Sequence, residues 1–420
     1  MITQETILDR LLPILKINSV KSTPAKDAPF GEGPKKALEC FLSLADSLGF
    51  KTKNYDNYIG EAIFGEGEPF GILCHLDVVP VGNLSAWKSD PFTPTIRDGN
   101  LYCRGVLDDK SAAICALSAL FEMKSNGITP DRQIRLIVGC DEESGWGCIN
   151  HYRKCAALPE EGFSPDADFP VIYAEKGIYH IRYRFDKLKE FTLSGGVKTN
   201  VVCDYARAEG DFSGAKETEK VKKDSKKAES FGVAAHGSTP DKGDNALRYM
   251  TAFLEENGFI RKGICDDLFG KAKGAKELCD ETGYLTFSPN VASTDNDKVY
   301  FTVDVRYPST IGLETVEKYL AEIGEYEVIS SQPPLFVDKN SPLVKTLNGV
   351  FNEVTGANCA PIAIGGGTYA RALKRGVAFG PVFGEEGDSV HMPNEYIPLS
   401  SLTKMTEIYY KALIKLCTKN

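Results

Sequence analysis

Short apolar runs alternate with an alanine-rich segment in the first third of the chain. Residues 70–76 (Phe-Gly-Ile-Leu-Cys-His-Leu) and residues 134–140 are apolar runs of the length of a buried strand, and each ends in polar residues. Residues 110–123, which lie between them, are rich in Ala and Leu and predict a helix. The order strand, helix, strand is typical of an α/β sheet, whose ligands gather at the carboxyl ends of the strands.

Helices are also expected near both ends of the chain. Apolar residues recur at helical spacing from Ile7 to Leu15, where Pro13 could introduce a kink. From about Leu335 the chain returns to helical and apolar strand patterns. The other helices expected in these two parts span residues 34–48, 341–354 and 402–416.

The middle of the chain, after about Asp186, has a different pattern. Residues 210–230 are dominated by Lys, Glu, Asp, Ser and Gly of mixed charge, and are expected to form a solvated helix or loop. Around this stretch, strands are expected at residues 200–208, 284–289 and 299–307. Helices are expected at residues 245–256 and 313–323. Because 420 residues exceed the size of one hydrophobic core, we expect two domains, an α/β body and an α+β insertion.

Composition and charge narrow the class of protein. Apolar residues make up 42% and charged residues 25%, which is typical of a soluble globular protein. No apolar stretch approaches the ~18 residues of a membrane span, and the N-terminus lacks the pattern of a signal peptide, so a cytoplasmic protein is expected. The 12 cysteines are scattered without a C-x-x-C pair and suit reduced thiols. A net charge of −9 without a basic stripe argues against nucleic acid or a membrane as partner.

Four groups of polar residues carry the candidate chemistry. They are His75-Leu76-Asp77, Asp108-Asp109 before the expected helix, Asp141-Glu142-Glu143 after an apolar run, and His391, which follows the glycine-rich segment Gly365-Gly366-Gly367. Residues two apart on a strand face the same side, so Asp77 can hold the ring that His75 presents to a metal. A carboxylate such as Asp108 has two oxygens and can bridge two cations. Three consecutive acids repel one another unless some of them are metal-bound or protonated.

The combination of these groups is more informative than any one of them. An isolated histidine on a strand is more often packed or exposed than metal-bound, and a run of acids is usually a solvated loop. The chain has only 5 histidines, however, and two of them lie beside acidic or glycine-rich segments. Zinc takes imidazole and carboxylate ligands together. His151 and His180 lack such surroundings and are expected to be structural.

These motifs and their order resemble the M20 metallopeptidases. The resemblance rests on G-x-x-x-H-x-D-V-V-P, G-x-x-D-D-K, D-E-E-S-G and the late histidine, and it covers nearly the whole chain. Narrower features resemble the dipeptidases of the PepV type, namely residues 163–170 (Phe-Ser-Pro-Asp-Ala-Asp-Phe-Pro), 305–308 and 364–369. The resemblance implies an α/β fold in which residues 1–186 and 336–420 form a catalytic domain with a central mixed β-sheet flanked by helices. Residues 187–335 would form an inserted α+β, ferredoxin-like lid.

The resemblance also implies a site with two zinc ions. One ion would be held by His75 and Asp166, the other by Glu143 and His391, and Asp108 would bridge them. Manganese or cobalt could replace zinc. Glu142 would be the general base and Asp77 would orient His75. The peptide between Asp108 and Asp109 is typically cis in this family.

Two positions compete for the carboxylate that completes the first ion's ligands. Glu175, in Ala174-Glu175-Lys176-Gly177, also follows an apolar strand. Asp166 lies in the Phe-Ser-Pro-Asp motif, where this branch of the family places its ligand. We therefore expect Asp166 to bind metal and Glu175 to support the site or to contact the substrate amine.

The inserted segment would supply further groups. His236, in Ala235-His236-Gly237-Ser238-Thr239-Pro240, resembles the family motif that brings a histidine to the reacting carbonyl, although a surface turn is the alternative. Asn200 and Arg306 match positions that hold the substrate's terminal carboxylate, Arg through its two-pronged fork. Arg371 is a further candidate, for which a structural ion pair is an equal alternative. The two domains are expected to close on the substrate.

The expected activity is hydrolysis of dipeptides with a free C-terminal carboxylate by metal-activated water. An N-acyl-amino-acid deacylase or a carboxypeptidase of the same family would share every metal ligand and is the nearest alternative. A non-catalytic metal- or peptide-binding relative would require a lost ligand or base, and none is missing. No G-x-S-x-G motif or Cys-His nucleophile pattern suggests covalent catalysis. A monomer is favoured over a dimer.

Overall fold

The chain divides into two compact units in a computed structural model that describes residues 2–218, 220–270, 275–384 and 389–419. The first unit comprises Met1–Tyr173, Val337–Ile362 and Thr368–Asn420, and the second comprises Ala174–Phe336 and Ala363–Gly367. The second unit is therefore inserted in the first. The second unit begins at Ala174, before the expected boundary at residue 187. It also includes Ala363–Gly367, the glycine-rich segment from the C-terminal part of the chain.

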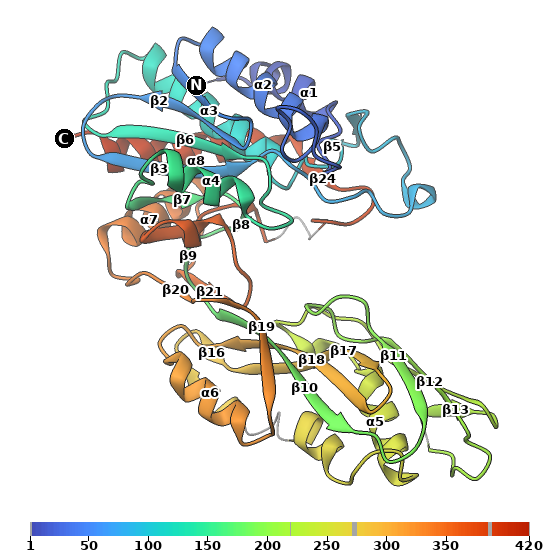
Figure 1. The fold of residues 1–420 in the computed structure, drawn as a ribbon. Coiled ribbons are helices and arrows are strands. Elements are labelled where there is room, and N and C mark those ends of the chain that lie inside the picture. Colours follow the sequence, from blue (N-terminus) through green and yellow to red (C-terminus); the bar gives the residue numbers. More distant parts are fainter. Residues whose placement is uncertain (1, 219, 271–274, 385–388, 420) are drawn as a thin grey trace. The chain divides into compact units, whose positions relative to one another are not determined.

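The first unit is built on a mixed sheet (Figure 1). The strands that lie wholly in the first unit are β1 (Lys51–Tyr55), β2 (Ile59–Phe64), β3 (Pro69–His75), β6 (Gln133–Gly139), β7 (Glu161–Ser164) and β22 (Arg375–Ala378). β9 (Ile172–Glu175) and β21 (Ile362–Ile364) run from the first unit into the second, and β20 (Leu335–Phe336) belongs to the second. The hydrogen-bonded order is β1-β2-β6-β3-β7-β22-β9-β20, and β21 also pairs with β9. The pairs β3–β6, β3–β7 and β7–β22 are parallel, whereas β1–β2, β2–β6 and β9–β22 are antiparallel. The expected mixed α/β sheet is confirmed.

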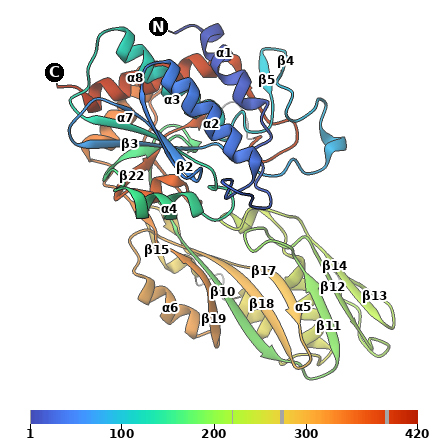
Figure 2. The same cartoon turned by 45° about the horizontal axis from the view of Figure 1, so that its top comes forward.

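Helices cover both faces of this sheet. They are α1 (Gln4–Leu15), α2 (Glu32–Ser47), α3 (Lys110–Ser125), α4 (Gly147–Cys155), α7 (Pro342–Thr355) and α8 (Leu399–Cys417). Gly60 and Glu61 are consecutive in β2, so they face opposite sides of the sheet. A Cβ on Gly60 would meet Leu38 of α2. The side chain of Glu61 accepts a hydrogen bond from Tyr152 of α4. The two helices accordingly lie on opposite sides of β2 (Figure 2).

The central strand and helix of the first unit are apolar on all sides. Ile72 and Cys74 on one face of β3 and Leu73 on the other are all fully buried. This explains the unbroken apolar run in the sequence, because a parallel strand covered on both faces does not alternate. Helix α3 packs between the sheet and the helices α1 and α8. Its small Ala side chains allow this close approach.

Small elements complete the first unit. They are the strands β4 (Thr95–Arg97), β5 (Asn100–Tyr102) and β24 (Tyr396–Pro398), the parallel pair β8 (Ala167–Asp168) and β23 (Pro381–Val382), and the 3-10 turns η1 (Leu84–Ala86) and η5 (Tyr369–Ala372). β24 pairs with β5, so the C-terminal part of the chain lies beside the loop that precedes α3. This pairing matters for the site described below.

The second unit is an antiparallel sheet with helices on one face. Its main strands are β10 (Gly177–Asp186), β11 (Phe191–Gly195), β12 (Tyr205–Gly210), β13 (Val221–Lys223), β14 (Lys227–Phe231), β17 (Thr286–Thr294), β18 (Lys298–Tyr307) and β19 (Tyr326–Gln332), in the order β13-β14-β12-β11-β17-β18-β10-β19. The other elements are α5 (Ala246–Glu256), α6 (Leu313–Ala321), the turns η2 (Pro240–Lys242) and η3 (Asp266–Gly270), and the short pair β15 (Cys279–Asp280) and β16 (Gly283–Tyr284). Apolar residues of α5, α6 and the sheet form one core, as expected of an α+β insertion.

Residues 210–230 were expected to form a solvated helix or loop. Residues 211–217 do form a loop, but the expectation was wrong where β13 and β14 lie. In β14, Ala228 and Ser230 are fully buried while their neighbours stay more exposed. A strand in a sheet that is covered on one face needs only every second residue to be buried, and small residues suffice. The high charge of the stretch therefore reflects its solvated face.

Among the residues that the structure describes, no helix is long and apolar enough to cross a bilayer. All 12 cysteines lie in the described part of the chain, and all of them are free thiols, as their scattered positions predicted.

Candidate metal centre

Three adjacent parallel strands bring the predicted ligands to one edge of the first unit's sheet. His75 is the last residue of β3 and lies opposite Gly139, the last residue of β6. The acidic turn 141–143 begins two residues after that glycine, and Asp166 follows β7, which pairs with β3 on its other side. The carboxyl ends of parallel strands meet at one edge, which explains why residues distant in sequence come together.

Two groups of possible ligands form at this edge and share one residue. His75 Nε2 lies 2.8 Å from Asp108 Oδ1 and 3.5 Å from Asp166 Oδ1. His391 Nε2 lies 2.9 Å from Asp108 Oδ2 and 3.0 Å from Glu143 Oε1. Within each group the ligand atoms lie within 4.8 Å of one another. Asp108 therefore offers one oxygen to each group, as a bridging carboxylate would.

The electrostatics of these groups suit bound cations. Burial raises the pKa of Asp166 to about 7, and the charge of Asp108 adds to the rise while His75 opposes it. Burial alone would lower the pKa of His391, but hydrogen bonds to Asp108 and Glu143 raise it to about 11. Three carboxylates and two imidazoles that crowd together are a donor set that zinc and similar divalent ions bind. The residues present fit a two-ion centre.

Asp77 supports His75 in a different way from the one expected. The ring nitrogen Nδ1 of His75 lies 2.9 Å from the main-chain carbonyl of Asp77 but 3.7 Å from its carboxylate. The carboxylate instead accepts hydrogen bonds from the backbone N–H groups of Glu142 (3.1 Å) and Glu143 (3.2 Å). Asp77 thus fixes the ring through its backbone and the acidic turn through its side chain.

Glu142 is the sequence neighbour of Glu143 and lies outside both ligand groups that share Asp108. Its Oε1 accepts a hydrogen bond from the indole N–H of Trp146 at 3.1 Å. Burial, and next the charge of Asp166, raise the pKa of Glu142 well above its usual value. A buried carboxyl of raised pKa beside a metal site is a candidate for proton transfer.

Glu395 organises the loop that carries Asp108, a role that the sequence did not reveal. Its buried carboxylate accepts a hydrogen bond from Arg104 Nη1 at 2.6 Å and others from the N–H groups of Gly105 (3.1 Å), Leu107 (2.8 Å) and Asp108 (3.3 Å). The only signal in the sequence was its place four residues after His391. The pairing of β24 with β5 brings the two segments together.

Asp109 belongs to the same loop and is fully buried. Its Oδ2 accepts the backbone N–H of His75 at 3.2 Å, and the peptide that joins it to Asp108 is cis, as the family resemblance implied. Burial, and next the charge of Asp166, raise the pKa of Asp109 well above its usual value. Asp109 is therefore placed to hold the end of β3 in position.

The predicted residues of the second unit lie close to one another within that unit. A β-bridge joins Val201 to His236, and the N–H of Gly237 donates to the carbonyl of Asn200 at 2.8 Å. Arg306 is almost buried and makes a two-pronged ion pair with Asp304, at 2.7 and 3.0 Å. The guanidinium of Arg306 thus has a carboxylate partner inside the protein. A role in binding substrate stays a prediction for Asn200, His236 and Arg306.

Glu175 and Arg371 lie outside the two ligand groups that share Asp108. Glu175 is fully buried at the end of β9, in the second unit, and lies in neither ligand group of the described residues. Arg371 lies in η5, within the first unit. The structure thus favours Asp166 over Glu175 as the neighbour of His75, and the role of Arg371 stays a prediction.

The chain is an α/β protein with a candidate two-metal centre. This class is defined by its mixed sheet and by the two imidazole–carboxylate groups at the carboxyl edge of that sheet. Consistent with this, the model of peptidase family M20/M25/M40 matches residues 71–415, and the chain belongs to this family.

Relatives and a solved structure agree with this assignment. The chain is 34% identical to "Putative dipeptidase MW1694" of Staphylococcus aureus, over 99% of this chain and 98% of that protein. It is also 34% identical to "Putative dipeptidase YtjP" of Bacillus subtilis, over 98% of this chain and 97% of that protein. The structure of human carnosine dipeptidase 1 superposes with a TM-score of 0.63 at 14% identity, covering 98% of this chain and 96% of the human one. The likeness to the human protein concerns the fold.

Proposed function

We propose that this protein is a zinc-dependent dipeptidase that hydrolyses dipeptides with a free C-terminal carboxylate. The observation that carries the proposal is the pair of ligand groups that share Asp108. Membership of a peptidase family and full-length similarity to bacterial proteins named as dipeptidases support the substrate class.

Five side chains would hold two zinc ions. His75 and Asp166 would hold one ion, Glu143 and His391 would hold the other, and Asp108 would offer one oxygen to each. Manganese or cobalt is also compatible with this set of nitrogen and oxygen donors. When bound, the two ions supply a water of lowered pKa and polarise the scissile carbonyl.

The remaining chemistry is carried by side chains. Glu142 accepts a proton from the attacking water and returns it to the leaving amine, which requires a carboxyl that is not itself a ligand. The hydrogen bond from Trp146 to Glu142 Oε1 restricts the orientation of that carboxyl. His236 donates to the developing oxyanion, a contribution of roughly 3–4 kcal/mol for such a donor. Asn200, Arg306 and Arg371 bind the terminal carboxylate of the substrate.

A substrate panel after metal removal and reconstitution tests the proposal. Exhaustive chelation should abolish hydrolysis of dipeptides, and zinc or manganese should restore it. Dipeptides should be hydrolysed faster than N-acetyl amino acids and faster than amidated dipeptides, because the latter lack the terminal carboxylate. Preference for N-acetyl amino acids would instead assign the protein to the deacylases, and full activity after chelation would contradict the metal mechanism.

The proposed location is the cytoplasm, where free thiols are kept reduced. The 12 unpaired cysteines support it. We also expect a monomer in solution, which sedimentation can measure.

A further inference from the structure

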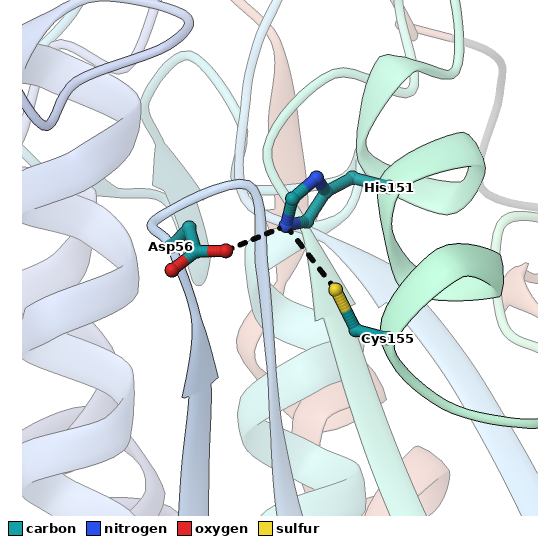
Figure 3. A group of neighbouring side chains, drawn as sticks. All are labelled: Asp56, His151 and Cys155. Carbon is teal, nitrogen blue, oxygen red and sulfur yellow. Dashed lines mark hydrogen bonds and ion pairs between the residues drawn. The ribbon is translucent and has the colours of Figure 1, made fainter.

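A third group of possible metal ligands lies in the first unit, apart from the residues of the centre described above. His151 Nε2 lies 2.9 Å from Asp56 Oδ2 and 3.5 Å from Cys155 Sγ (Figure 3). The three atoms all lie within 4.8 Å of one another. Asp56 comes from the turn between β1 and β2, whereas His151 and Cys155 come from α4.

Local structure holds the three side chains in this arrangement. His151 and Cys155 are four residues apart on α4 and therefore lie on the same face of the helix. The ring of Tyr58 stacks on the ring of His151, with centroids 4.1 Å apart and an angle of 14° between the planes. Asp56 and Asn57 have positive φ values of 52° and 61°, which fit a tight hairpin turn of the type that favours Asp and Asn.

The turn itself is tied down by Asn57. Its side chain accepts a hydrogen bond from Asn54 Nδ2 at 2.7 Å and donates one to the carbonyl of Asp27 at 2.8 Å. The carboxylate of Asp56 thus projects from a fixed hairpin toward a ring that is fixed by stacking. Side chains ordered in this way lose little conformational entropy when they bind a ligand.

The geometry favours metal binding over a catalytic role for the thiol. A nucleophilic cysteine uses one nitrogen of its histidine, and the orienting carboxylate uses the other. Here both the thiol and the carboxylate lie at the same nitrogen, Nε2 of His151, which has only one hydrogen or one lone pair to offer. A cation among the three atoms satisfies all of them at once.

The two distances from His151 Nε2 are close to those that a tetrahedral ion requires. Bonds of zinc to nitrogen, oxygen and sulfur place neighbouring ligand atoms about 3.3–3.7 Å apart. The observed 3.5 Å between nitrogen and sulfur fits, and the 2.9 Å between nitrogen and oxygen needs a shift of the exposed Asp56 carboxylate of about half an ångström. One thiolate, one imidazole and one carboxylate select zinc or a similar thiophilic divalent ion, with one position left for water.

We propose that Asp56, His151 and Cys155 form a second, peripheral site for a zinc-like cation. The bound ion links the C-terminal turn of α4 to the β1–β2 hairpin. Helix α4 directly follows the acidic turn of the metal centre, where the N–H of Gly147 donates to Asp141 Oδ2 at 2.9 Å. The ion therefore stabilises the helix on which that turn depends. His151, which its sequence surroundings suggested to be merely structural, acquires a role as ligand.

Cobalt(II) titration of the full-length protein tests the peripheral site. Sulfur–cobalt charge-transfer absorption in the near ultraviolet reports thiolate ligation, and the five ligands proposed for the two-metal centre contain no cysteine. The unmodified protein should develop this absorption, and Cys155→Ala should abolish it. Asp56→Ala should shift the titration to higher cobalt concentration. Cys359→Ala is the matched control and should behave as the unmodified protein. Cys359 is also exposed but lies in none of the three ligand groups found among the described residues.

Two results would overturn the peripheral site. One is the absence of sulfur–cobalt absorption in the unmodified protein, and the other is its persistence in Cys155→Ala. An unchanged titration curve in Asp56→Ala would remove Asp56 from the set of ligands. The cobalt titration does not depend on turnover. It therefore tests the peripheral site separately from the dipeptidase proposal.

Discussion

Glu395 and Arg104 form a buried ion pair, with Oε2 and Nη1 2.6 Å apart and both side chains 1% exposed. The carboxylate also accepts the backbone N–H groups that lead into Asp108, at 2.8 and 3.3 Å. One glutamate thus neutralises a buried guanidinium and fixes the loop that presents the shared carboxylate of the centre. A carboxylate with several strong donors is a rigid support, because each of its lone pairs has a partner.

Replacing Glu395 with Ala should lower the free energy of unfolding by about 3–5 kcal/mol, because Arg104 would remain buried without a counter-charge. Urea denaturation measures the change. Glu353→Ala is the matched control, since Glu353 pairs with Lys411 and Lys415 at the surface, where ion pairs contribute little. Equal, small effects in the two variants would contradict the supporting role of Glu395.

The assignment of Asp166 predicts a difference between two acidic residues. Asp166→Ala should lower metal occupancy, because Asp166 Oδ1 lies 3.5 Å from His75 Nε2 within one ligand group. Glu175→Ala should leave the ions bound, although it removes a more deeply buried carboxylate. Metal analysis after gel filtration distinguishes the two, and the opposite pattern would transfer the ligand role to Glu175.

Glu142 is predicted to move protons without binding metal. Glu142→Ala should keep its full metal content and lose about 10²–10⁴ in kcat, the range typical of a general acid–base group. Glu142→Gln should behave in the same way, because the amide keeps the size of the side chain and its acceptor for Trp146 but cannot take up a proton. Near-normal turnover in either variant would exclude this role.

Stability in acid should depend on Asp304, in the second unit. Burial opposes its charge, but two neighbours outweigh burial and hold the pKa of Asp304 below its usual value. They are His180, whose Nε2 lies 3.4 Å from Asp304 Oδ1, and the charge of Arg306. The pKa of this carboxyl is lower in the folded chain than in the unfolded chain, where it is about 3.9. Its ionised form therefore stabilises the fold at pH values above about 3.9. This stabilisation is lost as the pH falls through the folded-state pKa.

The corresponding variant is Asp304→Asn. At neutral pH it should be less stable than the unmodified protein by about 3–5 kcal/mol, because Arg306 loses its buried partner. The difference should narrow as the pH falls below about 4, where the aspartate itself becomes protonated. Thermal unfolding between pH 3 and pH 7 tests this, since a difference that stays constant over the range would contradict the proposed ion pair.

The sequence predicted the parts of the fold that depend on local pattern. The unbroken apolar run that ends at His75 is buried β3, and the Ala-rich segment after Asp109 is α3. Lys227 to Phe231 was mistaken for solvated helix or loop, because burial of two small residues, Ala228 and Ser230, leaves almost no hydrophobic signal. Local pattern also could not reveal where the second unit begins, since that depends on the pairing of β10 with β18 and β19.

The candidate site was predictable as a set of residue types but not as a set of contacts. His75, Asp108 and His391 were identifiable because imidazole and carboxylate groups occur together beside an apolar run, an expected helix start and a glycine-rich segment. The role of Glu395 depends on an ion pair with Arg104, 291 residues away along the chain, which no local pattern encodes. The contact of His75 with the carbonyl of Asp77, rather than with its carboxylate, likewise depends on backbone geometry at the end of β3.

The zinc content of the protein and of its Asp108→Ala variant tests the central claim most directly. Both should carry Cys155→Ala, so that the peripheral site does not contribute. After incubation with zinc and removal of the unbound metal, the reference protein should contain about two ions per chain. The Asp108→Ala variant should contain almost none, because each ligand group loses the carboxylate that it shares. Two ions retained without Asp108, or no tightly bound zinc in the reference protein, would contradict a centre built around that residue.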